Sequence, residues 1–251
     1  MPRSKIMGFL CGDIIFLHCR TRKDFMMEIE PIAYIHTDFK EKFGIPRQSG
    51  RVASLIGKVV FLPKYSREDA FRALDGFSHL WLIFDFSKAH CKNWSPTVRP
   101  PRLGGNQRVG VFASRSPFRP NPLGLSSVRL LGIERSAQHE MVLSVGGADL
   151  LDGTPIFDVK PYLPSADCRP DAIGGYADAQ NGYRLSVDFP KHLLGLIAKD
   201  KQCTVIDCLA EDPRPSYHYD KNRVYHMLFD CYEITFLVEN LSLKVLSVHM
   251  I

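Results

Sequence analysis

The chain has 251 residues, 45% of them hydrophobic and 24% charged, so it can bury one large or two modest cores and is not disordered. Its mean hydropathy of -0.10 and the lack of any run near the roughly 20 apolar residues of a spanning helix argue against an integral membrane protein. The seven cysteines are odd in number and form no C-x-x-C pair. This usage argues against a disulfide framework or a zinc knuckle and favours a reducing cytoplasm.

Positive charge is concentrated in one stretch of the chain. Lys and Arg outnumber Asp and Glu by 32 to 27, a formal net charge of +5, yet residues 86–133 contain no acid at all. The eight cations of this stretch leave the rest of the chain at about −3. The stretch also carries Trp94, Phe112, Phe118 and six prolines, and its arginines suit a polyanion. The cations are Lys88, Lys92, Arg99, Arg102, Arg108, Arg115, Arg119 and Arg129.

Residues 1–27 place cations ahead of an apolar stretch, as a secretory signal does. However, Asp13 interrupts the apolar region, and no small-residue cleavage site follows before Arg20. We interpret the segment as a start-site artefact or a loosely ordered extension and assign it no function. A chain that begins at Met27 is therefore expected to fold and work as well as the full chain.

Residues 29–160 predict a series of short strands. Segments rich in β-branched and aromatic residues alternate with clusters of Gly, Pro, Asn and Asp, which is typical of a β-barrel or sandwich. The sequence HLWLIFDF at 79–86 is apolar on both faces and predicts a central strand. One helix is expected at 66–74, with Ser66 as its N-cap and Glu68 and Asp69 in its first turn. The predicted strands are 29–36, 58–62, 79–86, 108–114, 127–132, 141–145 and 155–160.

The C-terminal part of the chain predicts a second domain. Residues 164–184 carry Pro and Gly without apolar periodicity, as a linker does. Helical segments around 191–199 and 203–209 and strands at 232–238 and 243–248 follow, the strands joined at Glu239 and Asn240. We therefore predict a mainly β protein with an extension (1–27), a β-barrel or sandwich domain (28–163), a linker (164–184) and a small α+β domain (185–251).

Several common catalytic signals are missing. No G-x-G-x-x-G follows a strand, and no glycine cluster ends in the Lys-Ser/Thr of a phosphate loop. The histidines lack metal-binding spacing, and no serine sits in a nucleophile elbow. These absences argue against a Rossmann cofactor site, a metal centre and a serine hydrolase.

Four polar loops at strand ends remain as candidate sites, and the one containing RPNP is the most informative. Its two prolines restrict the backbone, which lowers the entropy lost when Arg115, Arg119 and Asn121 meet a ligand. The alternative is that the prolines only end strands and the arginines are solvated. The loops are GIPRQ (44–48), FSHLW (77–81), SRSPFRPNPLGLS (114–126) and DLLDGTPIFDVKPY (149–162).

Two features of these loops have simpler structural explanations. Asp152 and Gly153 have the form of a tight hairpin turn. His79 lies among aromatic and aliphatic neighbours and is by default a hydrogen-bonded core histidine. The aromatics of HLWLIFDF are likewise expected in the core.

Taken together, the motifs PRQSGRV, FSHLWLIFDF, RPPRLGGNQRVGVFASRSPFRPNPLGLSSV, DLLDGTPIFDVKPYLP and EDPRPSY resemble the TsaA-like (YaeB) family. The similarity runs from about residue 29 to 164, and EDPRPSY extends it into the tail. It implies an S-adenosylmethionine-dependent enzyme that methylates N6 of threonylcarbamoyl-adenosine at tRNA position 37. It also implies a small β-barrel unlike the Rossmann methyltransferases and a homodimer with the cofactor near the subunit interface.

The resemblance also assigns residues. An arginine of the implied set can hold the methionine carboxylate, and Asp149 or Asp152 can hold the amino group or ribose hydroxyls. No metal and no identified general base are implied. Candidates for the nucleotide pocket are Arg119, Asn121, Lys160 and Tyr162, with Arg99 and Arg102 on the tRNA-facing surface. The implied cofactor contacts are Pro46, Arg47, Gln48, His79, Phe86, Arg115, Leu125, Asp149, Leu150, Leu151 and Asp152.

Two other functions stay open at the level of the residues alone. The basic stretch would also serve a non-catalytic RNA-binding module, and a methyltransferase could act on another acceptor. The conjunction of PRQ, RPNP and DLLDG favours the enzyme, because a pure binding module has no need of a cofactor pocket.

Overall fold

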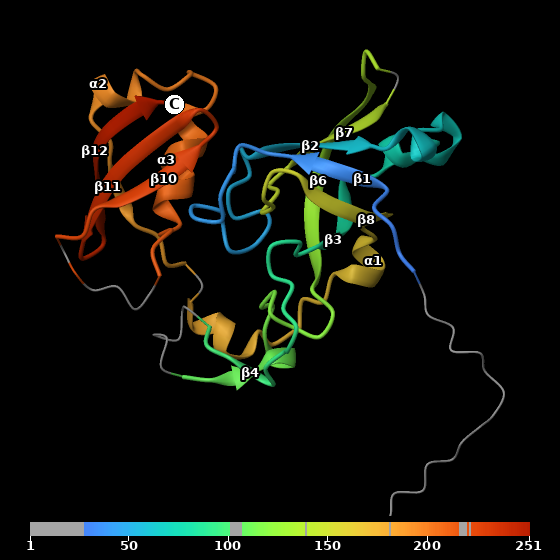
Figure 1. Ribbon diagram of the computed structural model, residues 1–251, viewed down its shortest axis with the longest axis horizontal. Helices are drawn as coiled ribbons and strands as arrows, with labels where there is room; N and C mark the ends of the chain where they lie inside the picture. Colours follow the sequence, from blue (N-terminus) through green and yellow to red (C-terminus); the bar gives the residue numbers. More distant parts are fainter. Residues whose placement is uncertain (1–27, 101–106, 139, 181, 216–219, 221) are drawn as a thin grey trace, which may run out of the picture.

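The computed structural model describes residues 28–100, 107–138, 140–180, 182–215, 220 and 222–251. The expectations for residues 1–27 and for Arg102 lie outside these ranges. Figure 1 shows two lobes side by side, a barrel and a smaller sheet. None of the helices in the described ranges is both long and apolar enough to cross a membrane.

Six strands form a closed antiparallel barrel in the order β1-β2-β7-β6-β3-β8, which confirms the predicted fold. Alternate side chains of each strand point inward, as Leu80, Leu82 and Phe84 do from β3. Closure leaves no strand edge of the barrel unpaired. The strands are β1 (Ala33–His36), β2 (Ile56–Phe61), β3 (His79–Asp85), β6 (Leu123–Arg135), β7 (Met141–Gly146) and β8 (Thr154–Pro161).

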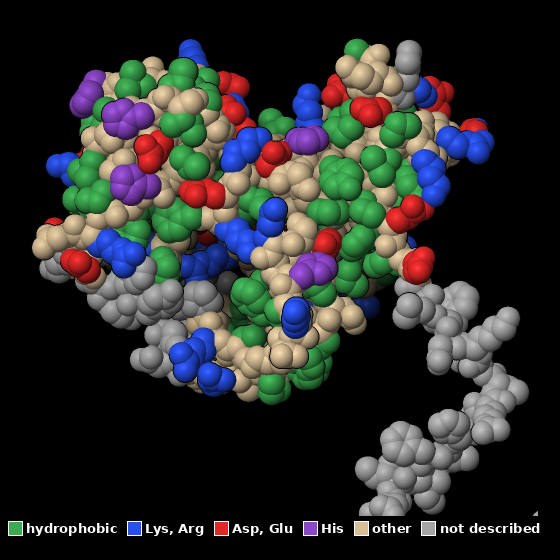
Figure 2. Space-filling model, viewed as in Figure 1, with side chains coloured by type: hydrophobic (Ala, Val, Ile, Leu, Met, Phe, Trp, Pro, Cys, Tyr) green, Lys and Arg blue, Asp and Glu red, His purple; other side chains and the backbone are tan. Residues whose placement is uncertain are grey.

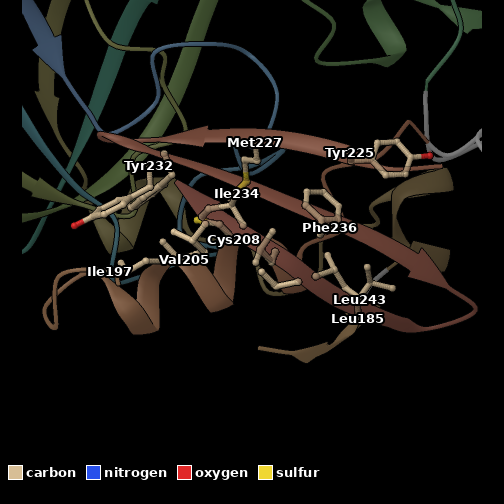
Figure 3. Close-up of a cluster of buried hydrophobic side chains, with 14 of the residues drawn as sticks. Leu185, Ile197, Val205, Cys208, Tyr225, Met227, Tyr232, Ile234, Phe236 and Leu243 are labelled. Atoms are coloured by element: carbon tan, nitrogen blue, oxygen red, sulfur yellow. The ribbon is translucent and has the colours of Figure 1, made fainter. Parts of the chain in front are cut away.

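The C-terminal lobe is the predicted small α+β unit. Its sheet has the order β10-β11-β12-β9, in which only β9 pairs in parallel. Helix α3 (Gln202–Ala210) buries Val205, Cys208 and Leu209 in the same cluster as the inward residues of the sheet (Figure 3). The other elements are α2 (Lys191–Leu194), β9 (Ser186–Asp188), β10 (Tyr225–Phe229), β11 (Tyr232–Glu239) and β12 (Ser242–Met250).

The segment between β1 and β2, residues 37–55, joins the two lobes. It leaves the barrel and lies between the lobes (Figure 1). Phe39, Val52 and Leu55 are buried in the core cluster of the C-terminal lobe, where the Phe39 ring meets Phe229 edge-on at 5.5 Å. A part of the predicted barrel domain therefore completes the core of the other lobe. The domain limits at 163 and 185 stay predictions.

The predicted linker contains short helices of its own. Helix α1 (Pro164–Asp167) follows β8, and a 3-10 helix spans Gly175–Gln180. The Asp167 carboxylate holds this start of the linker to the barrel, because it accepts hydrogen bonds from Trp81 Nε1 at 3.0 Å and from the Leu163 N–H at 2.8 Å.

The predicted strand 108–114 is wrong over most of its length. Only β5 (Val109–Gly110) is extended, paired with β4 (Thr97–Val98) outside the barrel, and a 3-10 turn at Val111–Ala113 follows. The Val111 N–H donates to the Pro96 carbonyl at 2.9 Å, so the short ladder closes on itself. Strand β10 was missed, and β6 starts earlier than expected, at Leu123.

The predicted helix at 66–74 is also wrong. The segment forms two 3-10 turns, Glu68–Phe71 and Leu74–Gly76, separated by Ala73 with φ of 64°. The Ser66 hydroxyl does not cap them. It donates towards the Phe61 and Leu62 carbonyls at 3.1 Å and accepts the Met141 N–H at 3.2 Å, which ties this turn to β7.

Candidate functional site

Three loops that are far apart in sequence meet beside the barrel and carry the first group of predicted cofactor residues. Arg115 Nη1 donates to Gln48 Oε1 at 2.5 Å, and the Gly50 N–H donates to the Gly147 carbonyl at 2.9 Å. Asp149 follows on the same loop as Gly147, within the electrostatic reach of Arg115. Gln48, Arg115 and Asp149, each from a different motif, therefore lie together.

Asp149 is the most tightly held member of this cluster. Its Oδ1 accepts the Ser126 hydroxyl at 2.6 Å, and backbone N–H groups of Ser49 and of Asp149 itself also donate to the carboxylate. Burial raises the pKa of Asp149, and these hydrogen bonds with the nearby Arg115 charge offset only part of that effect. A carboxylate withheld from water in this way attracts a cationic ligand more strongly than an exposed one.

This raised pKa leads to a stability prediction. Since the folded protein binds the Asp149 proton more tightly than the unfolded chain, the ionised carboxylate destabilises the fold at neutral pH, and the effect fades as pH falls below the folded pKa. We expect Asp149→Asn to melt at a higher temperature than the wild type at pH 7, by scanning calorimetry without ligand. The difference should shrink at acidic pH.

Asp152→Asn is the matched control, with the opposite sign. Partial burial acts to raise the pKa of Asp152, but hydrogen bonds from Lys40, the Thr37 N–H and His36 outweigh it and lower the pKa. The ionised Asp152 carboxylate therefore stabilises the fold at pH values above the ordinary pKa of an aspartate. Its replacement should therefore lower the melting temperature at pH 7. A drop of equal size in both variants would contradict the electrostatic explanation.

Leu150, Leu151 and Asp152 of the DLLD motif hold the local backbone through hydrogen bonds. Asp152 accepts Lys40 Nζ at 2.8 Å and the Thr37 N–H at 3.0 Å, so it orders the turn after β1. Leu150 is buried at 2% exposure and its carbonyl accepts the Thr37 hydroxyl. Leu151 is half-buried, and its carbonyl accepts the Thr154 N–H across a turn in which Gly153 has φ of 72°. A turn is present at Asp152 and Gly153, but the predicted hairpin is wrong, because the flanking strands β7 and β8 pair with other strands and not with each other.

His79 is not a core histidine. Its side chain is exposed at the start of β3, where Ser78 Oγ lies 3.0 Å from Nδ1. The Tyr162 ring lies 6.2 Å from the His79 ring and 5.5 Å from the Trp81 ring. The odd residues of β3 point outward because the barrel interior takes Leu80, Leu82 and Phe84, so the strand is not buried on both faces.

The outward group formed by His79, Tyr162 and Lys160 is distinct from the Gln48–Arg115–Asp149 cluster. Lys160 Nζ pairs with Asp158 at 2.7 Å, on the outer side of β8. Among the described residues, no hydrogen bond links the two groups.

The remaining predicted residues differ in their contacts and exposure. Phe86 is half-buried and its N–H donates to the Pro122 carbonyl at 2.8 Å, which anchors the RPNP loop. Arg119 Nη1 donates to the Ser114 and Ser116 carbonyls at 3.2 and 3.4 Å, so this arginine holds its own loop and is not simply solvated. Pro46 is buried, Arg47 is half-buried, and Asn121, Leu125 and Arg99 are exposed.

Sequence reasoning missed Ser49 and Ser126. Ser126 is a signal in retrospect, because it is a polar residue at an inward position of β6, between the buried Gly124 and Val128. Inward polar residues in a small barrel need a partner, and Asp149 is that partner.

The described residues include one groove away from the predicted site and no cluster suited to a metal ion. A groove of about 520 Å³ lies between the 68–77 segment and the second half of β6, lined by Phe71, Phe77 and Leu131 among others, and it contains none of the predicted site residues. Within the described ranges, no group of three or more His, Cys, Asp or Glu side chains is placed to hold a metal ion.

The fold and the site define a class, the β-barrel methyltransferases outside the Rossmann fold. A crystal structure of TrmO from Pseudomonas aeruginosa superimposes with a TM-score of 0.71 and 32% identity, over 89% of this chain and 98% of that chain. Residues 34–168 match the tRNA-methyltransferase O N-terminal domain, and residues 183–251 match the TrmO C-terminal domain.

Relatives with assigned names agree with these matches. A protein of Escherichia coli K12 named tRNA (adenine(37)-N6)-methyltransferase is 45% identical over 196 residues, which is 76% of this chain and 83% of that protein. One of the same name from Eikenella corrodens is 46% identical over 164 residues, 65% of this chain and 92% of that protein. The chain belongs to the tRNA-methyltransferase O (TrmO) family, which confirms the resemblance drawn from its motifs.

Proposed function

We propose that this chain uses S-adenosylmethionine to methylate N6 of the threonylcarbamoyl-adenosine at position 37 of tRNA. It is a S-adenosylmethionine-dependent tRNA (adenine37-N6)-methyltransferase, as its family and named relatives indicate. The threonylcarbamoyl form of the acceptor is the finer part of the proposal. The observation in this chain that supports the use of S-adenosylmethionine is the meeting of Gln48, Arg115 and Asp149 from three separate motifs.

The chemistry of these side chains fits the cofactor. Arg115 is exposed and presents a planar guanidinium, which binds a carboxylate through two hydrogen bonds. The partly buried Asp149 carboxylate supplies the negative charge that an ammonium or a sulfonium requires. When bound, S-adenosylmethionine supplies an electrophilic methyl group on its sulfonium sulfur.

The task of the protein in such a transfer is alignment. An in-line displacement gains most from holding donor and acceptor in one geometry, and loops stiffened by proline suit that role. The acceptor nitrogen lies between the purine and the carbamoyl carbon, so its proton is more acidic than that of plain adenosine. A weak base is then sufficient, and we assign none.

The acid-free stretch 86–133 supports tRNA binding next to the cluster. Lys42 Nζ donates to the Lys88 carbonyl at 2.8 Å, which adds a cation from the 37–55 segment to this side. Figure 2 shows Lys and Arg side chains gathered where the lobes meet and near the β4 end of the molecule. Trp94 and Phe112 are 48% and 74% exposed, with ring centroids 6.1 Å apart.

These two rings lead to a prediction about tRNA affinity. Stacking of an unpaired base on an aromatic ring contributes about 1–3 kcal/mol and releases no counterions. We expect Trp94→Ala to weaken tRNA binding at every salt concentration, with an unchanged slope of log K against log salt. Trp94→Phe should retain most of the affinity.

Arg99→Ala is the contrasting control. It removes a phosphate-binding cation and should flatten the salt slope, and neither variant should change cofactor affinity. A changed slope for Trp94→Ala, or equal tRNA binding at all salt concentrations, would contradict the stacking assignment.

A homodimer and a cytoplasmic location are further parts of the proposal. Leu123 and Leu125 on the outer face of β6 are 42% and 56% exposed, next to the loops of the cluster. Apolar side chains at such a position fit a second copy of the chain near the cofactor. Light scattering of the purified protein tests whether it is a homodimer.

Mass spectrometry of nucleosides tests the activity. Purified protein, S-adenosylmethionine and tRNA carrying threonylcarbamoyl-adenosine should yield the N6-methylated nucleoside, and tRNA without that modification should not. Binding of tRNA without methylation would favour the non-catalytic RNA-binding module. Methylation of the unmodified tRNA would indicate another acceptor.

A further inference from the structure

The described part of the EDPRPSY motif forms a rigid turn in the C-terminal lobe. Arg214 grips Asp212 with two parallel hydrogen bonds, from Nε at 2.8 Å and from Nη2 at 2.9 Å, and the Tyr183 hydroxyl donates to the same carboxylate at 2.8 Å. Both ionic side chains are only 13% exposed. Burial acts to raise the pKa of Asp212, but the hydrogen bonds from Arg214 and Tyr183 outweigh it, so the carboxylate stays ionised.

This turn holds the PRQ loop from one side. Arg47 Nη2 donates to the Arg214 carbonyl at 2.8 Å, and Arg51 Nε donates to Glu211 Oε2 at 2.8 Å. Glu211 is 5% exposed, so the second contact is an ion pair largely withdrawn from water. The two arginines flank residues 48–50.

The cofactor cluster holds the same three residues from the other side. Gln48 accepts Arg115, the Ser49 N–H donates to Asp149, and the Gly50 N–H donates to the Gly147 carbonyl. Residues 47–51 are therefore clamped between the EDPRPSY turn and the cluster.

Apolar packing leaves this segment little freedom to relax. Ile45 packs against the C-terminal core and Val52 is buried in it. Gly44, with φ of 96°, lies so close to Met227 that an added Cβ would stand 2.7 Å from the methionine side chain. The segment on which Gln48 sits is thus seated on the C-terminal lobe.

We propose that Asp212 is a positioning residue for the cofactor site. It fixes Arg214 so that the Arg214 carbonyl holds Arg47, and Arg47 in turn sets Gln48 beside Arg115. The C-terminal lobe thereby acts on cofactor binding without contributing a reacting group. This inference rests on the proposed function, because it takes the Gln48–Arg115–Asp149 cluster as the cofactor site.

Asp212→Asn is the informative variant. Asp212 has φ of 54°, a left-handed conformation that Asn adopts readily, so the turn keeps its backbone while the guanidinium loses its charged partner. We expect the Kd and KM for S-adenosylmethionine to rise about tenfold, the scale of one weakened charge-assisted hydrogen bond. kcat at saturating cofactor and the KM for tRNA should stay within about twofold of the wild type.

Asp207→Asn is the matched control. Asp207 lies on α3, and its side chain is 43% exposed and pairs with Arg184 at 2.8 Å. It has the same charge change at nearly the same place in sequence. The Asp207 carbonyl accepts the Glu211 N–H, but the side chain, which is the part that the substitution alters, has no described contact with Asp212, Arg214 or the PRQ loop. Its cofactor affinity should match that of the wild type.

A double-mutant cycle separates positioning from general damage. If Asp212 acts through Arg47, then Asp212→Asn combined with Arg47→Met should cost little more than Arg47→Met alone. Additive losses, or an unchanged cofactor Kd in Asp212→Asn, would overturn the inference while leaving the proposed function intact. Wild-type protein that binds no S-adenosylmethionine would reject the proposed function itself. Should Asp212→Asn fail to fold, Tyr183→Phe, which removes one hydrogen bond from Asp212, must show the same effect at smaller size.

Discussion

Arg115→Ala is expected to weaken S-adenosylmethionine binding by about 1.5–3 kcal/mol, which is roughly a 10- to 150-fold increase in Kd. The substitution removes the guanidinium that the cofactor carboxylate would pair with. It also removes the hydrogen bond that holds Gln48 at 2.5 Å, so two members of the cluster are lost together. Calorimetric titration of protein treated with a chelator measures the effect directly.

Two further variants define the cause. Arg115→Lys keeps the charge but not the planar fork, so it should recover only part of the affinity. Arg129→Ala removes an exposed arginine of the same basic stretch from the outer face of β6 and should leave cofactor binding unchanged. An unaltered Kd in Arg115→Ala would reject this cluster as the cofactor site.

Arg51→Ala is expected to lower the free energy of unfolding by about 2–4 kcal/mol, because removal of its closer partner leaves a buried charge with only weak compensation. The charge in question is Glu211, whose side chain is 5% exposed. After the substitution its only other cation among the described contacts is Arg184, at 3.5 Å. Denaturant unfolding followed by fluorescence measures the change.

A surface ion pair provides the comparison. Arg72 pairs with Asp69 three residues away, and both side chains are more than 70% exposed. Arg72→Ala should cost no more than about 0.5 kcal/mol, as exposed pairs do. Equal losses for Arg51→Ala and Arg72→Ala would show that the link between the PRQ loop and Glu211 contributes no more than a surface contact.

Local patterning by itself indicated a β-barrel or a sandwich, and the resemblance of the motifs to a known family selected the barrel. Alternation of β-branched and aromatic residues identified the strands that close the barrel, because inward and outward positions of a strand alternate strictly. The absence of acids in residues 86–133 led to the prediction that polyanions bind there. The motifs around Gln48, Arg115 and Asp149 marked the candidate site, since each is a short polar loop with a restricted backbone.

Only the tertiary structure decided how these pieces meet. Arg47 and the Arg214 carbonyl are 167 positions apart, so no local pattern could predict their contact. The failed helix at 66–74 has the same origin, because the Ser66 hydroxyl is taken by the N–H of Met141 on β7. The short β4–β5 ladder, the outward His79 and the seating of residues 37–55 in the second core all depend on partners distant in sequence. Intrinsic propensity limits the conformations that a segment can adopt. The partner that pairs with its hydrogen-bonding groups and covers its apolar surface determines which of these conformations forms.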